Sequence, residues 1–392
     1  MCVLVAVNQL GFGGIVPSLP LYAKSFGVSA SAIGLAIAVY GLARFVIAVP
    51  SGQFADRFGR RPALALGGLI SCLGNLWCAE ATTYPEFIIA RFIAGAGAGL
   101  ILTTGQVVLA DISKPERRGR IIAIYQGVFI FAVGIGPFPG GLLAEAWGLA
   151  APFWAYGVAS LLAGAVAWFA VSETRDLAGV GSVGAKGQAV TLVTQVRLLT
   201  GQVGFVLVGL IALMNAVART GGLFTIIPVL GSVRLSLSVA EIGFGLALGT
   251  IAGLLVAYPA GMLVDHFGRK SVIVPATTIS GASLVLFCIA PSYLWFVIAC
   301  ILWGSASSIG GAAPAAYAAD SAPPGMNAAA MSTFRMLGDF GYVSGPIMLG
   351  LIADAAGPIP ALLLAAALLV LVGLLFARLA PETHRARRMA PS

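Results

Sequence analysis

Long, uninterrupted apolar segments are the feature that most limits what this chain can fold into. A helix that crosses a membrane needs about 20 apolar residues. Twelve segments of this kind lie near residues 3–22, 32–52, 63–79, 85–109, 121–145, 151–171, 204–230, 241–262, 272–290, 293–318, 328–353 and 359–378. Only helices and closed barrels satisfy every backbone hydrogen bond in lipid, and continuous rather than alternating apolar residues favour helices. The sequence therefore predicts an all-α membrane protein with twelve transmembrane helices.

The composition excludes a water-soluble fold for a chain of this length. Of the 392 residues, 59% are hydrophobic and only 9% are charged, whereas charged residues make up about 25% of a typical soluble domain. In water, such a chain would expose large apolar areas. The first apolar segment begins almost at Met1 without a charged leader. We therefore expect it to act as an uncleaved signal anchor, unless the natural start lies further upstream.

Basic residues are distributed unevenly over the loops between these segments. Every second loop, or its edge, carries them: Arg57, Arg60, Arg61, Lys114, Arg117, Arg118, Arg120, Arg175, Lys186, Arg197, Arg269, Lys270, Arg378, Arg385, Arg387 and Arg388. The remaining loops carry only Lys24 and Arg234. Because cytoplasmic loops are enriched in Lys and Arg, we predict that the middle loop and the C-terminus are cytoplasmic, in a plasma membrane of the bacterial inner-membrane type. The formal net charge of +8 then reflects topology and not a nucleic-acid partner.

The chain also contains an internal repeat with a constant offset of 209 residues. The stretch from Pro50 to Arg61 recurs from Pro259 to Lys270, and the same offset relates Asp111 to Asp320. Such coincidences indicate a tandem duplication of a six-helix unit. An even number of helices keeps both copies in the same orientation, so the halves are parallel repeats.

The repeat defines the expected domain boundaries. We predict an N-terminal six-helix bundle at 1–171, a cytoplasmic linker at 172–202, a C-terminal six-helix bundle at 203–380 and a cytoplasmic tail at 381–392. Residues 189–199 of the linker fit a short amphipathic helix on the cytoplasmic face.

The turn between the second and third apolar segments concentrates charge. Gly59 permits a tight turn. Asp56 lies at a helix end among cations, where it can pair with an arginine or face the N-terminus of another helix. The pattern Gly52-x3-Asp56-Arg57-x-Gly59-Arg60-Arg61 resembles the signature loop of the major facilitator superfamily, and the resemblance covers essentially the whole chain.

This resemblance implies two six-helix bundles around a central cavity that opens alternately to each side of the membrane. It also implies a cytoplasmic gate. The residues of the gate would be Gly52, Asp56, Arg57, Gly59, Arg60, Arg61, Asp265, Gly268, Arg269 and Arg118. The alternative is that these charges only fix the topology.

Glycines and prolines interrupt the fifth apolar segment. Gly136, Pro137, Gly140 and Gly141 resemble an element of the drug/proton antiporter branch of the superfamily, which implies efflux by antiport. The alternative is an ordinary packing seam, because glycines permit close helix contact and proline bends a helix. The first segment resembles the same branch, although Asn8 stands where that branch often has an acid.

Charged residues inside the apolar segments are mostly cationic. Arg44, Arg91, Arg219 and Arg335 lie within segments, whereas Asp339 is the only acid clearly inside one. Arg335 and Asp339 are four residues apart and can pair on one helix face. The pair is either a structural strut or a proton switch in which protonation of Asp339 frees Arg335. The other arginines favour an anionic substrate.

Two further sets of residues complete the candidate site. Arg91, in Arg91-x3-Gly95-x-Gly97, resembles the arginine motif of the antiporter branch, which implies a role in proton movement, and the alternative is a structural arginine. Uncharged polar residues within segments can bind substrate or bond to the backbone. They are Asn8, Tyr40, Gln106, Gln126, Asn215 and Tyr342.

These observations predict a secondary transporter. The leading interpretation is a monomeric exporter of a small organic molecule by proton antiport through alternating access. Alternatives are a symporter or uniporter for a small anionic metabolite and, more distantly, a non-transporting membrane sensor. The sequence contains no metal-ligand spacing of cysteines and no nucleotide-binding glycine loop. We therefore expect no enzymatic activity, no metal and no cofactor, and the proton gradient as the energy source.

Overall fold

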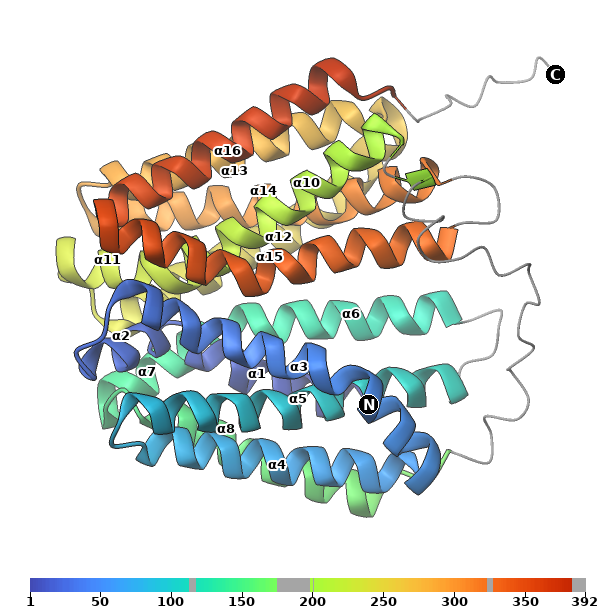
Figure 1. Ribbon diagram of the computed structural model, residues 1–392, viewed down its shortest axis with the longest axis vertical. Coiled ribbons are helices and arrows are strands. Elements are labelled where there is room, and N and C mark those ends of the chain that lie inside the picture. Colours follow the sequence, from blue (N-terminus) through green and yellow to red (C-terminus); the bar gives the residue numbers. More distant parts are fainter. Residues whose placement is uncertain (113–117, 175–197, 200, 323–326, 383–392) are drawn as a thin grey trace. The chain divides into compact units, whose positions relative to one another are not determined.

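The computed structural model describes residues 1–112, 118–174, 198–199, 201–322 and 327–382 (Figure 1). The described part of the chain contains helices and no strand. Contacts divide the chain into two compact units. Unit 1 comprises Met1–Ala185 and Pro228–Ala247, and unit 2 comprises Lys186–Ile227 and Leu248–Ser392.

The first half of the sequence forms eight helices in its described part. They are α1 (Cys2–Ile15), α2 (Leu19–Ser25), α3 (Ala30–Phe58), α4 (Arg60–Glu80), α5 (Tyr84–Ile112), α6 (Arg118–Ile135), α7 (Pro137–Trp147) and α8 (Ala151–Ala170). The described part of the second half forms α10 (Val203–Val217), η2 (Ala218–Ile226), α11 (Ile227–Arg234), α12 (Val239–Phe267), α13 (Lys270–Ile289), α14 (Tyr293–Asp320), α15 (Asn327–Ala356) and α16 (Pro358–Leu379).

The number of membrane spans agrees with the sequence. Among the described residues, eleven helical segments are long and apolar enough to cross a membrane, and the pair α1 and α2, bent by 48°, raises the number to as many as twelve. The predicted amphipathic helix at 189–199 and the predicted tail lie largely outside the described residues.

Several helices extend beyond the apolar segments that predicted them. The apolar run near 32–52 becomes a helix that ends only at Phe58, and the next helix begins at Arg60. Hydropathy reports the thickness of the apolar layer, whereas helix ends are set by backbone hydrogen bonding and caps. Ser238 and Glu241 form such a cap at the start of α12: the Ser238 backbone N–H donates to Glu241 Oε2 at 2.8 Å, and the Glu241 N–H donates to Ser238 Oγ at 3.2 Å.

Unit 1 is held together by contacts between small residues. Within it, α4 packs against α5 and α8, α3 packs against α5, and α1 packs against α6, α7 and α8. A Cβ atom added at Gly68 would collide with Gly164, and one added at Gly97 would collide with the backbone of Ser71. Such close approach stabilises helix pairs in lipid, where the hydrophobic effect between helices is absent.

Unit 2 combines glycine contacts with a core of large apolar side chains. There, α13 packs against α14 and α16, and α15 packs against α10, η2 and α16. Phe205, Ile273 and Phe376 belong to one fully buried cluster, while Gly249 and Gly304 bring α12 and α14 into backbone contact.

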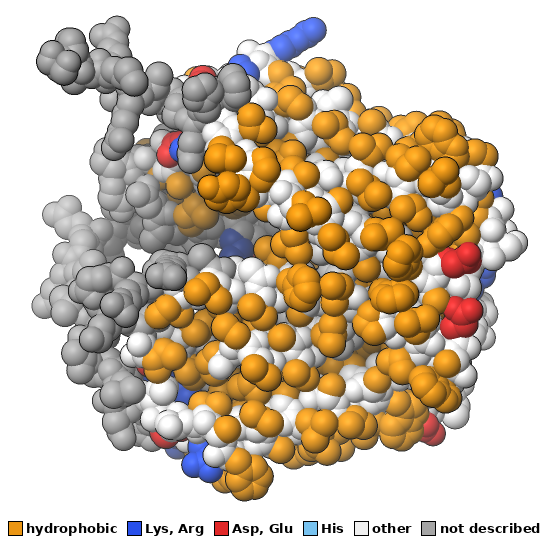
Figure 2. Space-filling view, turned by 180° about the vertical axis from the view of Figure 1, so that it is seen from behind, with side chains coloured by type: hydrophobic (Ala, Val, Ile, Leu, Met, Phe, Trp, Pro, Cys, Tyr) orange, Lys and Arg blue, Asp and Glu red, His pale blue; other side chains and the backbone are white. Residues whose placement is uncertain are grey.

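Large apolar side chains are also abundant on the outside. Phe169 is 82% exposed, Tyr258 77% and Trp147 75%. Figure 2 shows hydrophobic side chains over most of the visible face, with acidic and basic side chains mainly towards its margins. A surface of this kind suits a lipid environment. The prediction of a multi-pass α-helical membrane protein is therefore confirmed.

Candidate functional site

One glycine separates the two helices that meet at the signature turn. Gly59 has a φ of 105°, a backbone conformation that glycine adopts without steric cost. Its N–H donates to Ala55 O at 3.0 Å and closes α3, and α4 begins at the next residue. The predicted tight turn is thus a single residue long, which places the charged side chains on both sides of it close together.

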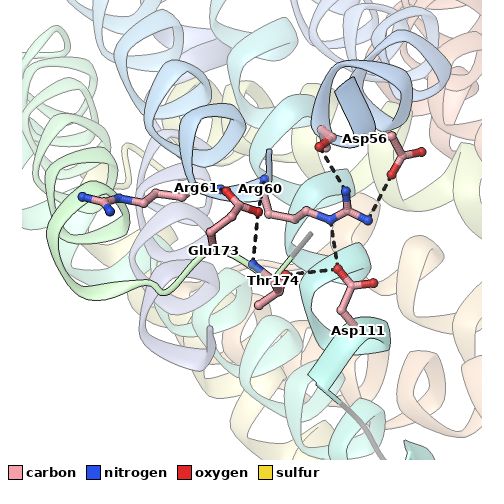
Figure 3. Close-up of polar contacts among 7 residues, drawn as sticks. Asp56, Arg60, Arg61, Asp111, Glu173 and Thr174 are labelled. Atoms are coloured by element: carbon pink, nitrogen blue, oxygen red, sulfur yellow. Dashed lines mark hydrogen bonds and ion pairs between the residues drawn. The ribbon is translucent and has the colours of Figure 1, made fainter. Parts of the chain in front are cut away.

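The Arg60 side chain is the centre of the turn (Figure 3). Its Nε donates to Asp111 Oδ2 at 2.9 Å, and its Nη2 lies 3.0 Å from Asp56 Oδ1. Its Nη1 donates to Ala55 O at 3.1 Å. The side chains of Arg60 and Asp111 are only 4% and 9% exposed, whereas Asp56 is 70% exposed. Arg60 therefore ties α3, α4 and α5 together, and Asp56 remains accessible.

A carboxylate from beyond α8 caps α4. Glu173 Oε1 accepts a hydrogen bond from the Arg60 backbone N–H at 2.9 Å, and Oε2 accepts one from the Arg61 N–H at 3.1 Å. The free N–H groups and the positive end of the helix dipole both favour an anion at this position. Thr174 Oγ1 donates to Asp111 Oδ2 at 3.1 Å, so the segment that follows α8 joins the same network.

The second half of the chain repeats this arrangement. Gly268 has a φ of 93°, and Arg269 Nε donates to Asp320 Oδ2 at 3.2 Å. Glu382 accepts hydrogen bonds from the backbone N–H groups of Arg269 and Lys270 at 3.1 and 3.0 Å. The Arg269 and Asp320 side chains are 17% and 37% exposed. The ion pair of the second copy is therefore more accessible to solvent than that of the first.

Glu173 and Glu382 are residues that the sequence reasoning missed. Their separation equals the repeat offset of 209 residues, and that relation would have identified them. They were overlooked because they lie outside the apolar segments and outside the signature pattern.

The other predicted gate residues differ in what surrounds their side chains. Arg57 lies 5.4 Å from the ring centroid of Phe58, and Arg61 lies 4.9 Å from that of Trp168. A Cβ atom at Gly52 would meet nothing within 4 Å. The side chains of Asp265 and Arg118 are outside the described part of the structure.

The predicted antiporter element forms a glycine seam. Pro137 begins α7, and Gly136 and Gly140 pack directly on Gly13 and Gly14 of α1. On its other side, Gly141 contacts the backbone at the start of α12. There, the rings of Phe138 and Phe244 lie 5.2 Å apart, edge to face. The seam therefore brings helices from both sequence halves together within unit 1.

Arg91 is fully enclosed within unit 1. It is 1% exposed, its Nε donates to Ala36 O at 3.2 Å, and its guanidinium lies 4.4 Å from the Tyr40 ring centroid. Among the described residues it forms no ion pair. These contacts favour the alternative that Arg91 is a structural arginine. No described carboxylate lies within ion-pair distance of its guanidinium, so none is placed to exchange a proton beside it.

The uncharged polar candidates differ in environment. Asn8 is fully buried, and neither atom of its amide has a hydrogen-bond partner in the described part of the chain. Asn215 Nδ2 donates to Ile211 O at 2.9 Å, within its own helix, while Gln126 is exposed. The candidate Tyr40 forms a buried hydrogen bond of 3.3 Å between its hydroxyl group and that of Tyr156, a partner that the sequence reasoning missed. Ser71 and Ser160 (3.1 Å) form a second buried link.

The predicted intramembrane ion pair is present in unit 2. Arg335 Nε lies 3.8 Å from Asp339 Oδ2, with side chains 70% and 54% exposed. Asp339 and Tyr342 also interact electrostatically with Arg219, which η2 carries. Arg44 lies in unit 1, within electrostatic range of Tyr125.

No group of three or more potential metal ligands occurs among the described residues. All five cysteines are free.

Comparisons with known proteins agree with this architecture. The family model described as the Major Facilitator Superfamily matches residues 1–238 and 208–391. An MFS-type transporter of Methanocaldococcus jannaschii is 24% identical over 350 residues, which is 89% of either chain. Multidrug resistance protein MdtL of Shewanella sp. is 24% identical over 72% of this chain and 70% of its own.

Two more similarities extend the comparison. Citrate exporter 1 of Aspergillus niger is 30% identical over 191 residues, 48% of this chain and 36% of that protein. Among solved structures, the nucleoside transporter NupG superposes with a TM-score of 0.79 at 13% identity, over 96% of this chain and 97% of the other. The structural match supports the predicted two-bundle transporter fold.

Proposed function

The chain belongs to the major facilitator superfamily, and from this premise we propose that it exports a small organic molecule across the membrane, driven by the proton gradient. It is a transporter and not an enzyme. The observation that carries the export proposal is the seam of α7, where Gly140 packs on α1 and Gly141 on α12. Glycine has no side chain beyond Cα, so these helices touch through their backbones. Helices from the two sequence halves can therefore close against each other and separate again without a change of side-chain rotamers.

Export is also consistent with the relatives. MdtL is named a multidrug resistance protein, and the α7 seam contains the residues by which the sequence resembles drug/proton antiporters. In the antiport form of the proposal, a proton enters as the solute leaves, and Asp339 is the proton carrier because it is the only acid clearly inside an apolar segment.

The duplicated turn network is proposed as the cytoplasmic gate. Arg60 and Glu173 hold the end of α3 and the start of α4 rigidly, while Asp56 stays 70% exposed. A rigid turn that presents one accessible carboxylate is suited to making and breaking a polar contact during alternating access.

A second candidate function is symport or uniport of a small anionic metabolite. The specific observation that favours it is the surplus of arginines over acids within the spans of the described chain. Citrate exporter 1, which shares 30% identity over part of the chain, is named for an anionic solute, and this supports the same candidate.

Counterflow in proteoliposomes distinguishes the two forms of coupling. Purified protein is reconstituted with a labelled solute inside, and a pH gradient of either sign is imposed. Antiport predicts that an acidic exterior accelerates solute exit, whereas symport predicts that it slows solute exit. Solute exit equal to that of protein-free liposomes would contradict the proposed function.

The membrane and orientation also belong to the proposal. We propose a monomer in a bacterial inner membrane with a cytoplasmic C-terminus, because the basic loops alternate along the chain. An epitope placed after Ser392 should be labelled only after the cells are permeabilised; labelling of intact cells would reverse the assigned orientation.

A further inference from the structure

We propose that Arg219, Arg335 and Asp339 form a binding site for a carboxylate-type organic anion, and that this anion binds together with a proton. The proposal rests on the second candidate function, symport of a small anionic metabolite, because an anion and a proton that bind together cross the membrane in the same direction. It specifies the residues that bind the anion and the proton. It concerns a cluster within unit 2 formed by η2 and α15. With Asp339 ionised, two cations and one anion leave a formal surplus of one positive charge.

The local backbone explains how Arg219 reaches this position. Residues Ala218–Ile226 form a π-helix, a wide-turned geometry that is rare and often associated with functional sites. Threonine hydroxyl groups of the π-helix bond to backbone carbonyls in it and just before it: Thr220 Oγ1 donates to Ala216 O at 2.9 Å, and Thr225 Oγ1 donates to Thr220 O at 2.7 Å. Gly345 brings α15 into backbone contact with this segment. The close packing places Arg219 within electrostatic range of Asp339.

The charges in the cluster are only loosely paired. The separation of 3.8 Å between Arg335 Nε and Asp339 Oδ2 is longer than a hydrogen bond. Both side chains are more than half exposed. Among the described residues Arg219 forms no direct ion pair. Both guanidinium groups therefore keep donors available, in the planar fork that matches a carboxylate.

Other described groups on the helices packed against α15 leave this charge balance unchanged. On α10, Asn215 is neutral and bonds to its own helix. On α14, Tyr317 bonds to Pro381 O and Asp320 pairs with Arg269, so neither is an unpaired charge. The only charged residue of α16 is Arg378, in its last turn. Tyr342, on α15 itself, is the remaining titratable neighbour of Arg219.

The sign of the coupling follows from this arrangement. Protonation of Asp339 removes its charge and raises the formal surplus from one to two positive charges, so an anion binds more tightly. By reciprocity, a bound anion favours protonation of Asp339. The expected effect is on the order of 5–150-fold in affinity. A cation would compete with the proton and would be repelled by both arginines.

Isothermal titration calorimetry on the full-length protein in detergent tests the site. The probes are benzoate and tartrate as organic anions and tetraphenylphosphonium as a cation, measured from about pH 6 to about pH 8, a range in which the two anions stay ionised. Comparing buffers of different ionisation enthalpy counts the protons taken up. We expect both anions to bind more tightly at the acidic end, with proton uptake, and the cation to bind no more tightly than in a detergent-only control.

Variants separate the roles of the three residues. Arg219→Gln and Arg335→Gln should each weaken anion binding about tenfold or more. Asp339→Asn should keep tight binding and lose both the pH dependence and the proton uptake. The matched controls Asp354→Asn, on the same helix, and Arg234→Gln, on the helix after η2, should behave as wild type. Thermal melting of each variant checks that it is folded.

Several outcomes would overturn the inference. They are absence of anion binding, proton release instead of uptake, or loss of anion binding in a folded Asp339→Asn variant. If the same preparation transports a neutral or cationic solute in proteoliposomes while no anion binds, the anion site is wrong and the transport function stands. If it transports no solute of any charge, the proposed function itself fails.

Discussion

At the scale of single residues, the signature turn depends on the absence of one Cβ atom. Gly59 adopts a φ of 105°, and a Cβ at this position would come 2.5 Å from Glu173 Oε2. The same carboxylate accepts two backbone N–H groups of α4. Glycine is therefore required both by the backbone conformation and by the helix cap that lies against it.

A pair of glycine substitutions tests this requirement. Gly59→Ala should destabilise the protein by roughly 1–3 kcal/mol, since it combines backbone strain with displacement of the cap. Gly52→Ala, inside α3, should leave the melting temperature unchanged or slightly raised, because nothing lies within 4 Å of the added carbon and alanine favours the helix. Thermal unfolding in detergent measures both, and equal melting temperatures would refute the structural role of Gly59.

Burial predicts different consequences for the two copies of the arginine network. Arg60→Ala leaves Asp111 with little exposure and without its cationic partner, with only the hydrogen bond from Thr174 remaining, which should cost about 3–5 kcal/mol. Arg269→Ala removes the equivalent contact, but Asp320 is 37% exposed, so the cost should be about 1 kcal/mol or less. Chemical unfolding of both variants compares them directly. A larger loss for Arg269→Ala would contradict the burial argument.

At the scale of elements, α7 packs through glycine on two sides. Gly140 contacts Gly14 of α1, and Gly141 contacts Val239 and Ala240 of α12. Pro137 begins the helix without a backbone N–H to satisfy. The element predicted from its resemblance to antiporters is thus also a packing seam, and the two interpretations do not exclude each other.

Substitutions in neighbouring helices separate close packing from helix propensity. Gly140→Ala should reduce stability by roughly 1–3 kcal/mol because the added methyl group overlaps the Gly14 backbone. Gly127→Ala in α6 meets nothing within 4 Å and should stabilise its helix by up to about 1 kcal/mol. The two melting temperatures should move in opposite directions. A stable Gly140→Ala variant with normal transport would argue against a tight seam.

At the scale of the whole molecule, the sequence predicted the fold well because its strongest signals are physical. Apolar length sets the number of spans, and the offset of 209 residues sets their repetition. The ion pair of Arg335 and Asp339 followed from spacing on one helix. The proximity of Arg219 did not, because it requires knowing that η2 packs against α15. The capping by Glu173 likewise depends on the path of the chain after α8.

Helix ends and the surroundings of Arg91 were harder to predict, because both depend on contacts that hydropathy does not report. Hydropathy locates the apolar part of α3 but not its last turn at Phe58. The resemblance of the Arg91 motif to antiporters implies a role in proton movement, which stays a prediction; in the fold, Arg91 bonds to a backbone carbonyl and lies over an aromatic ring. One sequence cannot show which residues surround a buried charge.

The gate proposal makes a prediction for the complete transport cycle. Asp56→Asn removes an accessible charge and weakens only one of the three contacts of Arg60, so the protein should still insert and fold. Transport should nevertheless fall by at least about tenfold, because the gate needs a charged partner. Membrane abundance and solute flux are measured on the same vesicles. Unchanged flux would remove Asp56 from the gate.

The central claim is that a proton gradient drives solute movement through this protein and that Asp339 carries the coupling. The most direct measurement is solute flux in proteoliposomes containing the wild type or Asp339→Asn, under an imposed pH gradient of either sign and under none. We predict that wild-type flux changes when the gradient is reversed, while Asp339→Asn transports at one rate under all three conditions. Wild-type flux that is the same in every gradient, or an Asp339→Asn variant that still follows the gradient, would contradict the account.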